Sequence, residues 1–281
     1  MKVLVFGHSG QVATELRRQS DVISLDRAAC DLSDPMACAA AVETRAPDVV
    51  INAAAYTAVD HAEENETLAT LINGHSPAAM AVACQRLNIP FLHVSTDYVF
   101  DGAKQGAWLT HDVPAPIGAY GRSKLVGETG IRAAGGQHVI LRTSWVFSAH
   151  GQNFVKTMLR LAETRTELNV VADQIGGPTP AGDIAATLLT IASDMTSGNG
   201  KTGTYHYSGT PAVSWADFAR TIFDTAGKKM TVNDIPSSDY PTPAARPVNS
   251  VMDCTDMLRD FGIPQPNWKK GLAAVIQDLS A

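Results

Sequence analysis

The sequence predicts an α/β fold in which a doubly wound parallel sheet carries a second, smaller lobe. Two observations lead to this prediction. Short apolar, β-branched runs alternate with longer Ala- and Leu-rich stretches up to about residue 146, and a proline-dense stretch follows residue 235. Continuous apolar strands that alternate with helices are typical of a parallel sheet covered by helices on both faces.

The alternation can be followed element by element. We expect strands at residues 3–6, 22–25, 49–52, 91–94 and 139–141. The helices expected between them cover residues 11–19, 35–45, 68–87 and 120–133. Asp34 is the expected N-cap of the second helix, because Pro35 follows it at the first helical position. This succession predicts a Rossmann-like, doubly wound parallel sheet, a fold that binds its ligands beyond the carboxyl ends of the strands.

The alternation becomes looser after residue 146. We expect helices at 153–164, 183–192 and 215–226, and one more strand at 203–207. The prolines then follow closely, at Pro236, Pro241, Pro243, Pro247, Pro264 and Pro266. Such a stretch is typical of a lobe made of loops and short helices. We therefore expect residues 1–146, with about 182–208, to form a dinucleotide-binding domain, and residues 147–181 and 209–281 to form the substrate lobe.

Composition excludes several classes of protein. The 281 residues are 45% hydrophobic and 18% charged, which suits a well-packed globular protein. The net charge of −6 and the lack of a basic block argue against nucleic-acid binding and against an anionic membrane surface. No apolar run reaches the roughly 18 residues of a membrane span. These features together indicate a cytoplasmic protein.

The four cysteines show no pattern of a metal site or a disulfide scaffold. They stand at Cys30, Cys38, Cys84 and Cys254, without a CxxC pair or a neighbouring histidine cluster. Zinc sites need such clusters, and disulfide scaffolds are shorter and richer in cysteine. The sequence therefore predicts neither.

A glycine-containing turn follows the first strand. The segment GHSGQV (7–12) puts Gly7 and Gly10 three residues apart, directly before the first helix. Glycines let the backbone turn sharply and approach a pyrophosphate, which the free N–H groups of the helix can then bind. An ordinary strand–helix connection is the alternative. The position after the first strand of an alternating pattern favours a dinucleotide.

The second expected strand ends in a carboxylate followed by a cation. Asp26 can bind the ribose hydroxyls of an adenosine, while Arg27 can accept a 2′-phosphate. Having both leaves the choice between NADH and NADPH open. Asp31 and Leu32 could flank the adenine, although Asp31 could equally be a turn or capping residue.

Tyr120 and Lys124 stand four residues apart at the start of a helix, so their side chains project from the same face. A nearby ammonium stabilises a phenolate and lowers the tyrosine pKa from about 10, as proton exchange requires. A surface pair is the alternative. The strand at 91–94 runs into Ser95 and Thr96, which puts hydroxyls where a substrate carbonyl would lie. A phosphate turn, a strand-end hydroxyl and YxxxK in this order resemble the short-chain dehydrogenase/reductases.

Longer segments extend this resemblance and include strings in the expected substrate lobe. They are 7–12, 48–60 (DVVINAAAYTAVD), 95–100 (STDYVF), 120–128 (YGRSKLVGE), 142–147 (RTSWVF), 153–161 (NFVKTMLRL), 173–179 (DQIGGPT) and 240–253 (YPTPAARPVNSVMD). These segments span almost the whole chain, and together they resemble one family of extended short-chain dehydrogenases, the dTDP-4-dehydrorhamnose reductases.

The resemblance implies a role for each matching residue. Thr96, Tyr120 and Lys124 would be catalytic, with Thr96 bonded to the C4 carbonyl of a sugar. The cofactor would be bound by Gly7, Gly10, Gln11, Val12, Asp26, Arg27, Asp31, Leu32, Ala53, Ala54, Ala55, Tyr56, Thr57, Tyr120 and Lys124. The substrate would contact Thr96, Asp97, Tyr98, Trp145 and Arg246. Trp145 could instead be a core aromatic residue, and Arg246 could form a structural salt bridge.

The implied reaction is the last step of dTDP-L-rhamnose synthesis. NADPH or NADH would deliver hydride to the C4 ketone of dTDP-4-dehydro-β-L-rhamnose. Thr96 and Tyr120 would stabilise the charge on the oxygen, and Tyr120 would donate the proton. The alternatives are a reductase of another nucleotide-linked 4-keto sugar and a non-catalytic, NADP-binding regulatory subunit.

The sequence departs from the family pattern at several positions. Ala13 replaces the third glycine of the cofactor turn, and Thr110 and Gly118 replace a frequent glutamate and asparagine. Some family members dimerise around magnesium held by glutamates. Glu15 matches one of those positions, but Gly182 and Asp278 occupy the other two. We therefore expect no metal, and either a monomer or a homodimer.

Overall fold

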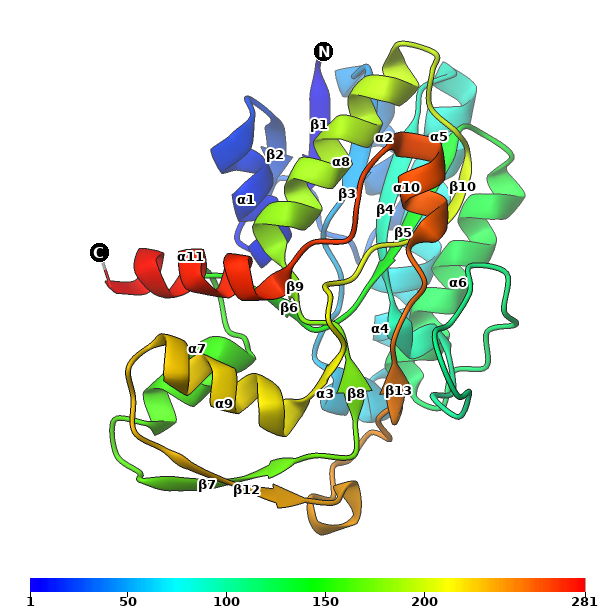
Figure 1. The fold of residues 1–281 in the computed structure, drawn as a ribbon. Coiled ribbons are helices and arrows are strands. Elements are labelled where there is room, and N and C mark those ends of the chain that lie inside the picture. The colour runs from blue at the N-terminus through cyan, green and yellow to red at the C-terminus, as the bar shows by residue number, and fades with distance from the viewer. Residues whose placement is uncertain (281) are drawn as a thin grey trace.

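The computed structural model describes residues 1–280 and contains a six-stranded sheet in which every neighbouring pair is parallel (Figure 1). Its strands are β1 (Val3–Phe6), β2 (Ile23–Leu25), β3 (Val49–Asn52), β4 (Phe91–Thr96), β5 (His138–Thr143) and β10 (Gly203–His206). The spatial order is β10-β5-β4-β3-β1-β2, which confirms the predicted doubly wound sheet. β2 and β3 lie on opposite sides of β1, so the direction of winding reverses there. Such a reversal opens a crevice at the carboxyl ends of the strands.

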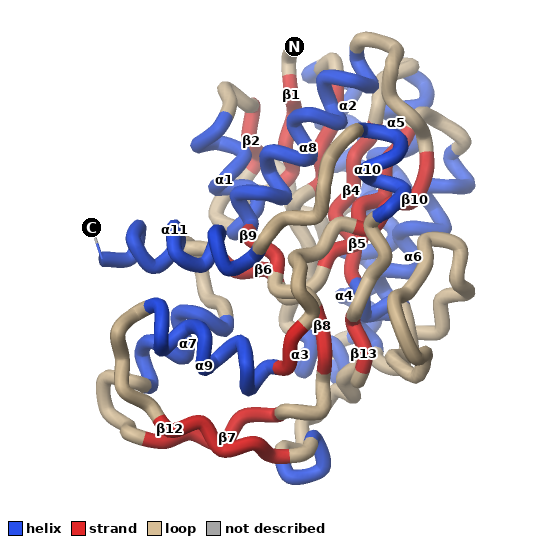
Figure 2. The backbone as a smooth tube through the Cα atoms, in the orientation of Figure 1, coloured by secondary structure: helices blue, strands red, loops and turns tan. Residues whose placement is uncertain are grey.

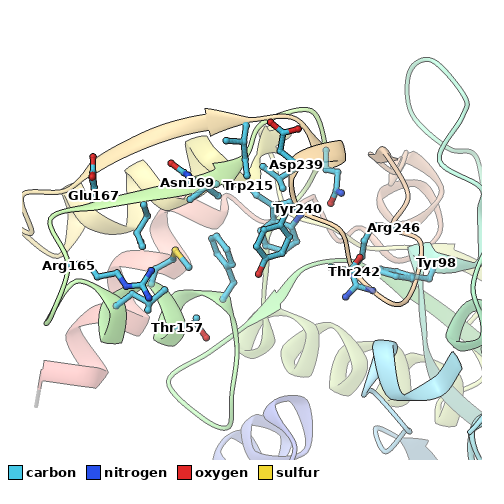
Figure 3. A pocket seen from close by; sticks show the side chains of 18 residues that line it. Tyr98, Thr157, Arg165, Glu167, Asn169, Trp215, Asp239, Tyr240, Thr242 and Arg246 are labelled. Carbon is cyan, nitrogen blue, oxygen red and sulfur yellow. The ribbon is translucent and has the colours of Figure 1, made fainter. Parts of the chain in front are cut away.

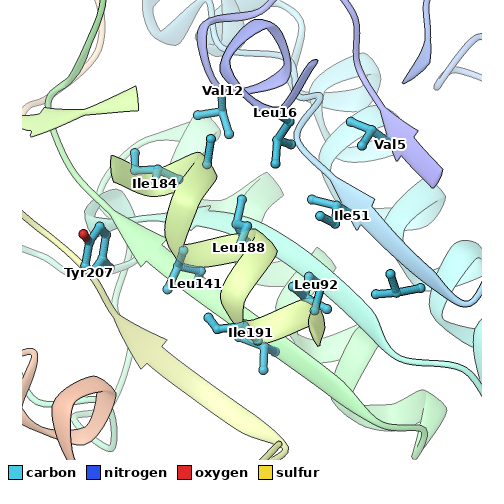
Figure 4. Packing of buried hydrophobic residues seen from close by; sticks show 14 of the residues in the cluster. Val5, Val12, Leu16, Ile51, Leu92, Leu141, Ile184, Leu188, Ile191 and Tyr207 are labelled. Carbon is cyan, nitrogen blue, oxygen red and sulfur yellow. The ribbon is translucent and has the colours of Figure 1, made fainter. Parts of the chain in front are cut away.

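Helices cover both faces of this sheet. α1 (Gln11–Gln19) and α8 (Ala181–Thr196) pack on one face, while α2 (Pro35–Arg45), α5 (Ser76–Leu87) and α6 (Ala119–Ala134) cover the other. Successive residues of a strand point to opposite faces. Val5 therefore belongs to the core under α1 and α8, whereas Phe6 belongs to the core under α2 and α5. Figure 4 shows Leu16 of α1 and Ile184, Leu188 and Ile191 of α8 packed toward the strands.

The helical stretch expected at 68–87 is interrupted, so the expectation of one regular helix is wrong. α3 (Val59–Glu64) and α4 (Glu66–Thr70) precede a π-helical turn (Leu71–His75) that leads into α5. The extra residue in this turn accompanies the burial of Asn73. Its amide accepts a bond from Tyr56 N at 2.7 Å and donates to Ser123 Oγ at 3.0 Å. Asn73 thereby fixes the loop after β3 against α6.

A second group of elements lies beyond the carboxyl ends of the sheet strands (Figure 2). Three helices, α7 (Phe154–Leu161), α9 (Trp215–Thr225) and α11 (Trp268–Ser280), share a core that includes Phe218 and Trp268. β7 (Glu167–Val171) pairs in parallel with β12 (Thr231–Ile235) at the edge of this group. Short pairings complete it: β6 (Val146–Phe147) with β9 (Thr179–Pro180), and β8 (Ile175–Gly176) between β11 (Val213–Ser214) and β13 (Asn249–Ser250).

One helix of the expected substrate lobe lies against the large sheet instead. α10 (Thr255–Phe261), expected in the substrate lobe, packs against β10 of the large sheet. Tyr205 of β10 donates a hydrogen bond to Asp260 Oδ2 at 3.0 Å, and its ring contacts Phe261 edge to face. β10 is an edge strand, so α10 covers apolar surface that would otherwise face water. The other boundaries stay a prediction.

No helix within residues 1–280 is both long enough and apolar enough to cross a lipid bilayer.

Candidate active site

A cleft of about 830 Å³ runs along the carboxyl ends of the sheet strands, from β2 to β5. All residues predicted to bind the cofactor line it: Gly7, Gly10, Gln11, Val12, Asp26, Arg27, Asp31, Leu32, Ala53, Ala54, Ala55, Tyr56, Thr57, Tyr120 and Lys124. Of the residues predicted to contact the substrate, Thr96, Asp97, Tyr98 and Trp145 line the same cleft. Arg246 lines a neighbouring cleft. Fold topology thus brings most of the predicted site together.

The start of α1 forms an open cradle at one part of this cleft. Gly7 has φ of +116°, and a Cβ there would lie 3.3 Å from Ala13 Cβ, so a side chain would be both strained and crowded. A Cβ at Gly10 would meet nothing within 4 Å, and no side chain caps the helix at that residue. The first amides of a helix have no partner within it. The site therefore fits the pyrophosphate of a dinucleotide.

Asp26, Arg27 and Asp31 surround the expected adenosine end of the cleft. Asp26 Oδ1 accepts a hydrogen bond from Ala29 N at 2.8 Å, and Arg27 Nε lies 3.2 Å from Asp31 Oδ2. The Arg27 side chain is 83% exposed, so it can turn toward a ligand. Asp31 Oδ1 also accepts from Ser33 N at 2.9 Å, so this carboxylate does stabilise a turn, the alternative left open by the sequence.

Thr96 and Asp97 form a small hydrogen-bonded unit at the end of β4. Thr96 Oγ1 accepts from Tyr98 N at 3.2 Å and donates to Asp97 Oδ1 at 3.1 Å. Burial raises the pKa of Asp97 to about 6. Asp97 Oδ2 and Thr143 Oγ1 are buried without a hydrogen-bond partner within residues 1–280. Buried polar atoms of a native protein are normally paired, so unpaired ones in a cleft indicate positions for ligand atoms.

The spacing of Tyr120 and Lys124 predicts that the two side chains interact, but the lysine has other partners in this structure. Burial raises the pKa of Tyr120 to about 12, so the expectation that Lys124 lowers it is wrong for the free protein. The reason is the direction of the lysine side chain. Its Nζ donates to Val94 O at 2.7 Å and lies 3.0 Å from His93 Nε2, on the side of β4. Lys124 is itself buried, and burial lowers its pKa to about 7.

A second cleft of about 700 Å³ adjoins the first, and Tyr98 lines both. Its walls include the aromatic side chains of Phe154, Trp215 and Tyr240. Figure 3 shows Arg246 and Tyr98 at one end of this cleft and Arg165 at the other.

Arg246 forms the structural salt bridge that was one of its two expected roles, and its role as a phosphate contact stays a prediction. Its Nη2 lies 2.9 Å from each carboxylate oxygen of Asp60, which is a structural ion pair. Its Nη1 is buried and has no partner in the described part of the chain, so it can still bind an anionic ligand.

Trp145 lies between the two clefts. It lines the first cleft, and its ring stacks on Trp215, which lines the second, with 3.5 Å between ring centroids and 9° between planes. Its backbone has a positive φ of 47°, which is uncommon for a non-glycine residue. Strain of this kind persists where surrounding contacts maintain it, and it is frequent at functional sites.

Several polar residues of this region carry no prediction from the sequence. Asn52 and His93 are fully buried on neighbouring strands, and their only sequence signal is a polar residue within an apolar strand. Gln11 Oε1 accepts from Ser148 Oγ at 2.8 Å and from Asn153 Nδ2 at 2.9 Å, which ties α1 to the loop before α7.

Glu15, the residue that matches a metal position of the family, has other partners in this structure. It contacts Arg18 at 3.1 Å and His150 at 2.9 Å. Across residues 1–280, no three His, Cys, Asp or Glu side chains cluster as a metal site requires.

The sheet, the open helix start and the Thr96–Tyr120–Lys124 group define a short-chain dehydrogenase/reductase. A family model described as "RmlD substrate binding domain" matches residues 1–281. A dTDP-4-dehydrorhamnose reductase of Sinorhizobium fredii is 44% identical over 99% of this chain and 98% of its own. The chain therefore belongs to the dTDP-4-dehydrorhamnose reductase family.

Solved structures agree with this assignment. The fold matches a dTDP-4-dehydrorhamnose reductase of Clostridium acetobutylicum with a TM-score of 0.94 and 36% identity, over 100% of both chains. It also matches the enzyme of Bacillus anthracis in complex with NADP, with a TM-score of 0.92 and 35% identity over 99% of this chain and 100% of the other.

Proposed function

We propose that this protein reduces the C4 ketone of dTDP-4-dehydro-β-L-rhamnose to dTDP-L-rhamnose with NADPH or NADH. The observation that carries the proposal is one continuous cleft, with the uncapped start of α1 in one part and Thr96, Asp97 and Tyr120 in another. This arrangement supports binding of a dinucleotide with its reactive end beside a proton donor. The names of the relatives support the choice of substrate.

The bound cofactor would supply hydride to C4, and the side chains of the chain would manage the charge that develops on the C4 oxygen. Tyr120, with a pKa of about 12, is protonated at neutral pH and can donate its proton. Thr96 can stabilise the same oxygen if its hydroxyl turns from Asp97 to the substrate. Both residues therefore act on one oxygen atom.

The second cleft supports binding of the nucleotide part of the substrate. Phe154, Trp215 and Tyr240 offer aromatic surface for a base, and Arg246 Nη1 offers an unpaired donor for the diphosphate. Such local recognition is compatible with a net charge of −6, because a few placed donors replace a broad basic surface.

An assay with purified protein tests the proposal. Enzymatically generated dTDP-4-dehydrorhamnose is added with NADPH or NADH, cofactor oxidation is followed at neutral pH, and the product is identified by NMR. Formation of dTDP-rhamnose supports the proposal. Faster oxidation with a different nucleotide-linked 4-keto sugar supports the first alternative, and cofactor binding without oxidation of any such sugar supports a regulatory subunit.

Replacing Tyr120 by phenylalanine should lower kcat by about 10²–10⁴-fold, because the variant loses its positioned acid. The dissociation constant for NADPH should change little, since the ring and its edge-to-face contact with Tyr98 remain. Tyr207→Phe is the matched control, because Tyr207 is buried in the core under α8. Near-normal turnover of Tyr120→Phe would show that another group donates the proton.

A further inference from the structure

Asn52, His93 and Lys124 form a buried hydrogen-bonded chain that the proposed hydride transfer does not use directly. Asn52 of β3 and His93 of β4 are register partners in the sheet, and both are fully buried. Lys124 comes from α6 and is 1% exposed. The distances are 3.1 Å from Asn52 Nδ2 to His93 Nδ1 and 3.0 Å from His93 Nε2 to Lys124 Nζ.

The neighbours of Asn52 determine where the imidazole carries its proton. Asn52 Oδ1 accepts a hydrogen bond from Ala54 N at 3.2 Å, so its NH₂ group is the part that faces His93 Nδ1. An NH₂ group only donates, so Nδ1 must accept. Burial keeps the pKa of His93 well below its usual range, so the ring is neutral. A neutral ring whose Nδ1 accepts carries its proton on Nε2.

This tautomer of His93 determines which protonation state of Lys124 can form a hydrogen bond with it. The Nε2–H of His93 faces Lys124 Nζ, and a hydrogen bond forms only if Nζ offers a lone pair. An ammonium has no lone pair, whereas a neutral amine has one and can still donate to Val94 O at 2.7 Å.

Among the charged groups around Lys124, Glu128 favours the ammonium and raises the lysine pKa, but burial has the larger effect. Glu128, one turn further on α6, is bound by Arg142 of β5 at 2.7 Å and by Ser95 at 2.7 Å. Tyr120 is protonated, and Asp97, with a pKa of about 6, lines the same cleft. Burial accordingly lowers the pKa of Lys124 to about 7.

We propose that Asn52 and His93 are positioning residues that hold Lys124 as a neutral amine in the cofactor-free protein, through a tautomer of His93 protonated on Nε2. The inference rests on the proposed function only where it gives Lys124 a part in the reaction. Stabilising the neutral amine makes the protonated form of Lys124 a stronger acid. When solvent protonates Nζ, the ammonium can pass this proton to a Tyr120 phenolate: an N–H bond breaks, the tyrosine O–H bond forms again, and Nζ returns to the neutral amine.

¹⁵N NMR of the wild-type protein without cofactor tests the tautomer directly. We expect His93 to carry its proton on Nε2 and to have an unprotonated Nδ1 across the neutral pH range. A proton on Nδ1, or a doubly protonated ring, would overturn the proposal. The measurement is independent of catalysis, so its failure is distinct from a failure of the proposed reductase activity.

The titration of Lys124 in a His93→Phe variant gives a second test. The two possible directions of the hydrogen bond between His93 and Lys124 predict opposite shifts of the Lys124 titration midpoint. If His93 donates to a neutral amine, its loss destabilises the amine and raises the midpoint of the Lys124 ¹⁵Nζ titration, by about one pH unit for a bond of about 1.4 kcal/mol. If an ammonium donates to His93, the loss lowers the midpoint and contradicts the proposal.

His138→Phe is the matched control. It removes another buried histidine from the neighbouring strand β5, and the Nδ1 of His138 contacts the Gly136 carbonyl rather than a lysine. The Lys124 midpoint should stay unchanged in this variant. In an active enzyme, His93→Phe should also shift the pH profile of kcat in the direction of the Lys124 midpoint, while His138→Phe should not.

Discussion

Asp97 shows how burial changes the chemistry of a single side chain. Its carboxyl group accepts the Thr96 hydroxyl through Oδ1, while Oδ2 is buried without a partner in the described residues. The low polarity around it disfavours the carboxylate and raises its pKa from 3.8 to about 6. The folded protein therefore binds this proton more tightly than the unfolded chain does.

This shift predicts the pH dependence of an Asp97→Asn variant. A raised carboxyl pKa makes wild-type stability greatest at low pH and lowers it as pH rises from about 4 to about 6. Asparagine cannot ionise, so the variant should have a free energy of unfolding about 2–3 kcal/mol above wild type near pH 8. Near pH 4 the two should differ little. Urea unfolding at both pH values measures the difference, and equal curves at pH 8 would contradict the assigned shift.

Arg27 offers a second test at the scale of one residue. Its ion pair with Asp31 is exposed, and such pairs contribute about 0–1 kcal/mol, so a 2′-phosphate can replace the carboxylate. Arg27→Ala should raise KM for NADPH about tenfold or more, as expected for loss of a charge-assisted hydrogen bond. KM for NADH should change less than twofold.

Steady-state kinetics with both cofactors measure this difference. Arg86→Ala is the control, since Arg86 forms a comparable exposed pair with Glu43 at 3.3 Å and does not line the cleft. Equal effects of Arg27→Ala on both cofactors would remove Arg27 from 2′-phosphate recognition.

The contact of β8 with Trp145 illustrates the scale of one element. Gly176 of β8 packs directly on the indole, and a Cβ at that position would lie 2.6 Å from Trp145 Cε2. Trp145 cannot move away easily, because its other neighbour is the stacked ring of Trp215. The strand therefore acts as a support that determines where the indole lies between the two clefts.

Gly176→Ala should accordingly displace the indole. We expect KM for the nucleotide sugar to rise at least several-fold and KM for NADPH to stay within about twofold. Gly182→Ala is the control, since a Cβ there would meet no atom nearer than 3.7 Å. Steady-state kinetics of both variants measure KM for the nucleotide sugar and KM for NADPH separately. An unchanged KM for the nucleotide sugar in Gly176→Ala would contradict a substrate contact by Trp145.

At the scale of the whole molecule, most of the sheet, the glycine turn and the Tyr120–Lys124 spacing could be predicted from local patterns, whereas cleft residues such as 53–57 were expected only from the family resemblance. Apolar strands, helix starts and glycine turns are set by residues close together in the chain. The lobe of α7, α9 and α11 was less predictable. Its strand pairs, such as β7 with β12, join residues more than sixty positions apart, and a run of two residues such as β8 carries no periodicity.

The interruption at Leu71–His75 and the position of α10 were not predictable for a similar reason. A π-helical turn depends on Asn73 finding Tyr56 and Ser123 as partners, and neither partner is local. Likewise α10 covers β10 because an edge strand nearly fifty residues earlier is left open. Both features follow from tertiary contacts rather than from propensity.

The sequence by itself determined the alternating α/β architecture, the glycine turn, the position of Thr96 at the end of its strand and the spacing of Tyr120 and Lys124 near the start of their helix. These properties depend on spacing along the chain, which folding leaves unchanged. Only the tertiary structure decided how these groups behave. Burial raises the pKa of Tyr120 and lowers that of Lys124. The Lys124 side chain contacts His93, which lies thirty-one residues earlier in the chain, rather than Tyr120. The physical reason is that desolvation and hydrogen-bond direction depend on neighbours that the chain acquires only when it folds.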